Sequence, residues 1–131
     1  MTIARGTFTV TGGDEQTIRG ADGGPRLTRI NGSQRFEGAI VGDGAVDWLM
    51  RYASDGSARF AGFQRIAGAI GGRSGSFELE STGFHDGRSS SGNWRIVPGS
   101  GTGDLEGISG YGTFEAPGGP MAAYTLDYEI G

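Results

Sequence analysis

The sequence predicts an all-β protein, a single eight-stranded antiparallel barrel with little or no helix. Apolar and polar residues alternate with period two in segment after segment, the pattern of strands with one buried and one solvated face. Turns rich in glycine, aspartate and serine separate these segments, and the chain holds 28 glycines. Because eight strands can close into a barrel that is filled by side chains or holds one small ligand, we expect a meander-like barrel. An open two-sheet sandwich is the alternative.

A chain of 131 residues predicts one domain, spanning 1–131, that buries roughly two thirds of its unfolded surface. Its content of glycine and proline approaches that of disordered segments. However, the thirteen aromatic residues are regularly placed, which indicates a packed core. Single glycines within the alternation then indicate bulges, tight turns and close approaches of neighbouring strands.

The first half of the chain predicts four strands, at 3–11, 27–41, 46–52 and 59–70. Segment 46–52 also fits helical spacing, but its β-branched and aromatic residues favour a strand. It lies between two predicted turns, Asp43-Gly44 and Asp55-Gly56. In 59–70, Phe60 and Gln64 share the inward face.

The second half predicts four more strands, at 76–85, 91–97, 110–114 and 122–130. Between the second and third of these, 104–106 can form a helical turn capped by Thr102 or Asp104. The last strand alternates almost to the end of the chain. We therefore expect it to pair with the first strand and close the barrel.

Composition excludes several classes of chemistry. The net charge of −4 and the scattered acidic residues give no basic surface for nucleic acid. All eleven basic residues are arginine, so lysine chemistry is absent, and the lack of cysteine removes thiol nucleophiles, disulfides and metal–thiolate sites. We expect no metal site and no cofactor.

The segment that begins the chain does not have the pattern of a signal peptide, and no apolar run is long enough to span a membrane. We therefore expect a cytoplasmic protein of bacterial type that does not bind membranes.

Three glycine-containing segments carry a family resemblance: Phe60-Ala-Gly-Phe-Gln-Arg-Ile-Ala-Gly68, Gly71-Gly-Arg-Ser-Gly-Ser-Phe77, and Trp94 through Pro98-Gly-Ser-Gly-Thr-Gly103. Together with Tyr124-Thr-Leu-Asp-Tyr128, they resemble a bacterial family of small domain-of-unknown-function barrels whose fold is similar to that of plant allene oxide cyclase. The resemblance covers nearly the whole chain and implies an eight-stranded antiparallel barrel. It implies no activity.

Candidate ligand-binding residues are the aromatic and amide side chains on the predicted inner faces. A buried amide needs hydrogen-bond partners, so Gln64 either joins a structural network or orients a ligand. The aromatic members suit a pocket wall or a filled core equally well. The candidates are Gln64, Trp48, Tyr52, Trp94 and Tyr124.

Weak catalytic candidates are His85, Tyr52 and Glu37. His85 is the one histidine, and a polar residue beside the Asp86-Gly87 turn is the simpler interpretation. Glu37 falls on an outward face, where arginine would pair with it, unless the register of its strand differs by one residue.

Three hypotheses of function follow. The leading one is a barrel that binds a small apolar or amphipathic molecule, with Gln64 as its polar anchor. The second is a cofactor-independent cyclase or isomerase for a lipid-like or polyketide-like substrate. The third is a filled barrel that acts through homo-oligomerisation, since Ala61, Phe63, Ala67 and Ala69 make one outer face apolar.

Overall fold

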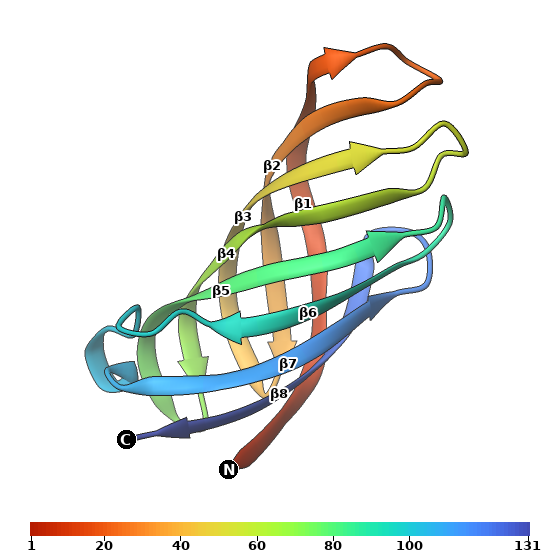
Figure 1. The fold of residues 1–131 in the computed structure, drawn as a ribbon. Helices are drawn as coiled ribbons and strands as arrows, with labels where there is room; N and C mark the ends of the chain where they lie inside the picture. The colour runs from red at the N-terminus through yellow and green to blue at the C-terminus, as the bar shows by residue number, and fades with distance from the viewer.

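The structure is a computed structural model that describes residues 1–131, and it is a closed barrel of eight antiparallel strands in chain order (Figure 1). The predicted fold class is confirmed, and segment 46–52 is strand. The strands are β1 (Thr2–Gly20), β2 (Arg26–Gly38), β3 (Ile40–Tyr52), β4 (Ala58–Ile70), β5 (Arg73–His85), β6 (Ser90–Ile96), β7 (Ile108–Ala116) and β8 (Met121–Ile130). One short 3-10 helix, η1 (Gly103–Leu105), lies between β6 and β7.

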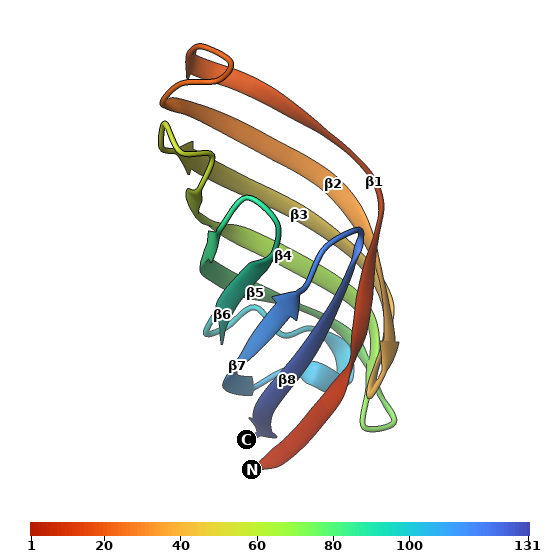
Figure 2. The same cartoon turned by 90° about the vertical axis from the view of Figure 1, so that its right-hand side faces the viewer.

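Strand β1 closes the barrel along only part of its length. It pairs with β8 from Thr2 to Thr9 and with β2 from Gly6 to Gly20. Beyond Thr9, the backbone N–H of Val10 still donates to the carbonyl of Pro120 at 2.9 Å, and then β1 has a neighbour on one side only. Figures 1 and 2 show β1 and β2 reaching far past the point where β8 begins. The barrel is therefore closed at one end and open to the side at the other.

One predicted turn is misplaced. The turn expected at Asp43-Gly44 lies instead between β2 and β3, where Gly38 has a φ of 95° that favours glycine. Gly44 lies inside β3, and a Cβ there would be 2.7 Å from the Phe36 ring. The glycine serves packing across strands, which an Asp-Gly pair in a sequence does not distinguish from a turn.

The predicted helical turn is present as η1, but its predicted cap is wrong. Thr102 precedes η1 without a capping bond from its side chain. Its hydroxyl oxygen instead accepts from the backbone N–H of Ser76 on β5 at 3.0 Å. The loop is thereby held against β5, and Leu105 of η1 is buried in the core.

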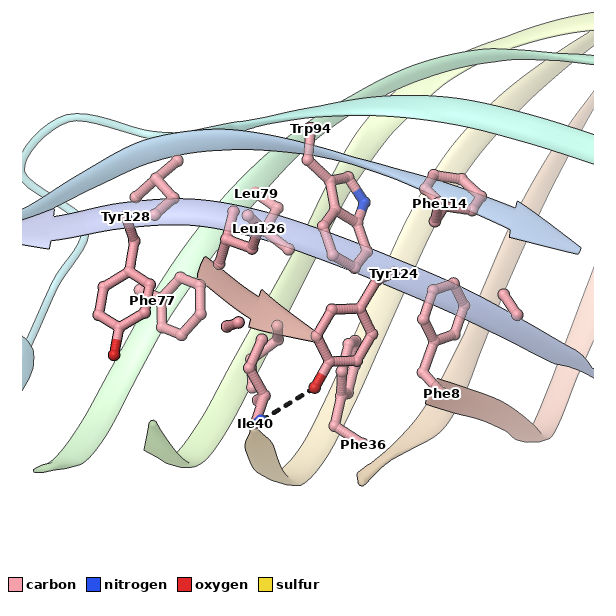
Figure 3. Close-up of a cluster of buried hydrophobic side chains, with 14 of the residues drawn as sticks. Phe8, Phe36, Ile40, Phe77, Leu79, Trp94, Phe114, Tyr124, Leu126 and Tyr128 are labelled. Atoms are coloured by element: carbon pink, nitrogen blue, oxygen red, sulfur yellow. Dashed lines mark hydrogen bonds between the residues drawn. The ribbon is translucent and has the colours of Figure 1, made fainter. Parts of the chain in front are cut away.

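Aromatic side chains fill the closed part of the barrel (Figure 3). The Phe8 ring centroid lies 5.1 Å from that of Phe36 and 5.8 Å from that of Trp94. The Tyr124 hydroxyl donates to the Glu37 carbonyl at 3.0 Å and accepts from the backbone N–H of Ile40 at 2.9 Å, the bond dashed in Figure 3. This part of the interior is a packed core.

None of the helical structure in the chain has the length and apolar character needed to cross a membrane.

Candidate ligand-binding site

A pocket of about 510 Å³ lies against the first three strands at the open end of the barrel. Its lining residues are Val10, Thr11, Gly12, Gly13, Asp14, Glu15, Ile30, Asn31, Gly32, Gln34, Val46 and Trp48. Glycines leave part of the wall without side chains. A Cβ on Gly32 would lie 2.6 Å from the Gly12 carbonyl oxygen, so β1 and β2 approach too closely here for another residue.

Three buried hydrogen bonds beneath the pocket fix the orientation of two amides. Gln64 accepts on Oε1 from Trp94 Nε1 and from the Ser81 hydroxyl, both at 2.8 Å. Because an indole N–H can only donate, Gln64 must turn its oxygen toward Trp94. Its Nε2 then donates to Gln34 Oε1 at 2.8 Å, so the orientation of Gln34 is fixed as well.

Two buried donors at the pocket are left without a partner. They are Gln34 Nε2 and Trp48 Nε1, and both residues line the pocket. Gln34 is 2% exposed, and the Trp48 ring is packed with its centroid 4.8 Å from that of Phe60. Buried donors are almost always paired in folded proteins, so two donors without partners, on residues that line the same pocket, indicate a place for an acceptor.

Hydrogen bonds hold the outer edge of the pocket. Glu15 Oε2 accepts from the Thr28 hydroxyl at 2.6 Å and from the Tyr52 hydroxyl at 2.9 Å. The Arg26 guanidinium carbon lies 4.0 Å from the centre of the Tyr52 ring. Burial, followed by the hydrogen bond to Glu15 and the negative charge of Glu15, raises the pKa of Tyr52 to about 12. Tyr52 therefore keeps its proton and acts as a donor.

The structure divides the ligand-binding candidates into two groups. Trp48 lines the pocket and Tyr52 lies at its edge. Gln64, Trp94 and Tyr124 are at most 3% exposed and use their polar atoms within the core. Burial raises the pKa of the Tyr124 hydroxyl, which stays protonated.

Sequence reasoning missed Gln34 and Glu15. Gln34 is a polar residue two positions from Phe36, on an otherwise apolar face. This is the same signal that singled out Gln64. Glu15 carries no such signal. It lies in the part of β1 where every residue is exposed and apolar alternation is absent.

The three catalytic candidates do not form one cluster. Tyr52 on β3 and His85 on β5 are both opposite Ala58 on β4, which lies between them. His85 Nδ1 lies 2.8 Å from the Ser90 hydroxyl. Glu37 is exposed near the other end of β2. No group of three or more His, Asp or Glu side chains could hold a metal ion.

The outer surface carries two ion pairs, Arg29 with Asp47 and Arg35 with Asp43, each at 2.8 Å. Glu37 is not among them, so the expected pairing with arginine is wrong for this residue. Phe63 on the outer face is 50% exposed and lies between Asp47 and Glu80 of the adjacent strands. The apolar face of β4 is therefore interrupted by charge.

The family described as "Protein of unknown function (DUF3224)" matches residues 4–128. A crystal structure at 1.84 Å resolution of a protein of unknown function from the DUF3224 family of Shewanella oneidensis MR-1 is similar, with a TM-score of 0.78 and 24% sequence identity. The similarity covers 100% of this chain and 98% of that one, and at this identity it shows a shared fold. No curated protein sequence matches the chain.

Proposed function

This chain belongs to the DUF3224 family, whose description names no activity, and we propose that it binds a small, mostly apolar molecule in the pocket at the open end of its barrel. The observation that carries the proposal is the pair of unpartnered donors, Gln34 Nε2 and Trp48 Nε1. Each buried donor without a partner costs about 1–3 kcal/mol. A ligand that brings an acceptor to them would recover part of that free energy on binding.

The walls of the pocket suit such a molecule. Ile30, Val46 and Trp48 present apolar surface, and the volume falls within the range of small-molecule sites. Gln34 takes the place of Gln64 as the polar anchor in this proposal. Gln64 has the supporting role, because its own hydrogen bonds hold Gln34 in one orientation.

Binding is better supported than catalysis. A cyclase or isomerase that works by proton transfer needs a group beside the pocket that exchanges a proton near neutral pH. Tyr52, the candidate at the pocket edge, has a pKa of about 12 and is held as a donor to Glu15. His85 does not line this pocket.

Tryptophan N–H signals in nuclear magnetic resonance test the proposal, because the chain has 2 tryptophans. Titration with 2-nonanone, an uncharged probe with one acceptor oxygen, should shift the Trp48 indole signal and leave that of Trp94 nearly in place. Trp48→Phe assigns the signals. Ile30→Phe narrows the pocket and should weaken the response, whereas Ile3→Phe, a matched change at an exposed position of β1, should not. An unchanged Trp48 signal at saturating probe would refute the proposal.

A further inference from the structure

We propose that the pocket selects uncharged molecules that carry a hydrogen-bond acceptor, of the ketone, ester or ether class, and discriminates against carboxylates. This inference rests on the proposed function. It adds the charge and the hydrogen-bonding polarity of the ligand: the polarity follows from the hydrogen bonds of the buried amides, and the charge from the acidic residues that line the pocket.

The two unpaired groups on residues that line the pocket can only donate. Trp48 offers an indole N–H, which has no lone pair to accept a hydrogen bond. Gln34 would be able to offer its oxygen instead, but that oxygen already accepts from Gln64 Nε2. Gln64 cannot reverse, because its own oxygen is held by Trp94. A ligand that brings an acceptor can therefore pair with these two donors, and one without an acceptor would leave both unpaired.

The charged groups on the pocket disfavour an anion. The two charged lining residues are Asp14 and Glu15, and both are acidic. Arg26 at this edge is not a lining residue and stacks on the Tyr52 ring. A carboxylate would lose hydration in the pocket without meeting a cation. An uncharged acceptor satisfies the two donors without that cost.

Two probes of equal chain length test the preference: 2-nonanone and nonanoate. Dissociation constants from the Trp48 indole shift, at a pH where the acid is ionised, should show the ketone bound at least about tenfold more tightly than nonanoate. Tighter or equal binding of nonanoate would overturn the inference and leave the proposed function standing. A Trp48 signal that responds to neither probe would remove the proposed function itself.

The source of the discrimination against the anion is tested by Glu15→Gln, which removes a charge and preserves the shape of the side chain. We expect the affinity for 2-nonanone to change by less than about twofold and the ratio between ketone and nonanoate to fall. Asp43→Asn is the matched control, since it removes one carboxylate paired with Arg35 on the outer surface. A ratio that falls equally in both variants would show that net charge, and not Glu15, sets the preference. Because the comparison between the two probes is made first on the unaltered protein, it stands whether or not Glu15→Gln folds well.

Discussion

Gln34 and Gln64 meet across β3, on the inside of the barrel, although two strand spacings separate β2 from β4. They reach each other over Gly44, where a Cβ would lie 3.3 Å from Gln34 Oε1. Every hydrogen bond of this network is buried, so the cost of removing a member depends on how many partners it leaves unpaired.

This dependence predicts unequal effects for two similar substitutions. Gln64→Leu leaves the polar atoms of Trp94, Ser81 and Gln34 without a partner and should lower the free energy of unfolding by about 3 kcal/mol or more. Gln34→Leu leaves only Gln64 Nε2 and should cost about 1–2 kcal/mol. Urea denaturation of both variants and of the double variant measures the effects. The double variant should lose less than the sum, and additive losses would mean that the two amides are not coupled.

Tyr52 predicts a pH dependence at the edge of the pocket. Its pKa in the folded protein, about 12, is higher than the value of about 10 for an unfolded tyrosine. The contribution of protonated Tyr52 to the stability of the folded protein is therefore complete below about pH 10 and is lost as the pH rises toward 12. Over that interval the native protein should lose stability relative to Tyr52→Phe. Denaturant titrations of both proteins near pH 8 and pH 11 measure the difference, and parallel pH profiles would contradict the assignment.

At the scale of the strand, the glycines that face neighbouring backbone decide how closely strands approach. Gly62 on β4 is opposite Trp48 on β3. A Cβ at Gly62 would lie 2.0 Å from the Asp47 carbonyl oxygen and 2.8 Å from Cδ1 of the Trp48 ring. The ring that lines the pocket therefore depends on a residue without a side chain on the next strand.

Gly62→Ala should destabilise the barrel by about 2–3 kcal/mol and shift the Trp48 indole signal, because backbone and ring must both move. Gly24→Ala is the control. Its Cβ would have the Ala21 carbonyl oxygen as its nearest neighbour, at 3.8 Å, and its effect should stay within about 0.5 kcal/mol. Thermal or urea unfolding compares the two. Equal stability of the two variants would show that β3 and β4 can separate freely at this point.

Sequence reasoning was also most accurate at the scale of the strand. Alternation predicted the eight strands, the inward faces of Gln64 and Trp94, and the pairing of the first strand with the last. Alternation wrongly predicted that the first strand ends at Thr11. The part of β1 that extends past β8 does not pack on the core, so its residues do not alternate between apolar and polar. Alternation also missed the anchor of the site, since the role of Gln34 depends on Gly44 and Gln64, which become its neighbours only through the register of three strands.

For the molecule as a whole, each strand pairs with the next along the chain, and β1 with β8 is the one pairing that joins distant segments. That pairing brings the two ends of the chain to the same end of the barrel (Figures 1 and 2). In the closed part of the barrel the sheet thus has no first strand, and the position of the chain ends should matter little to it.

A circular permutant tests this property. A short glycine–serine linker would join Gly131 to Met1, and new ends would open the exposed turn at Gly56 between β3 and β4. We expect native near-ultraviolet circular dichroism and a monodisperse elution profile, because the permutant keeps every strand pairing. A chain that lacks Met121–Ile130 should aggregate, since β1 and β7 would both be left with unpaired edges. Aggregation of the permutant as well would show that the native chain order is needed for closure.

The relay from Trp94 through Gln64 to Gln34 means that the hydrogen-bonding polarity of the proposed site depends partly on a strand that does not line the pocket. Trp94 lies on β6 and is not among the residues that line the pocket. Replacing it with a side chain that accepts would allow both amides to reverse, and Gln34 would then present its oxygen inward. One remote exchange would thus replace one of the two donors by an acceptor and leave the Trp48 indole N–H beside it, while the wall of the pocket kept every residue. If the pocket binds a ligand as proposed, relatives of this chain that share the same pocket wall would differ in specificity according to the residue at the position of Trp94.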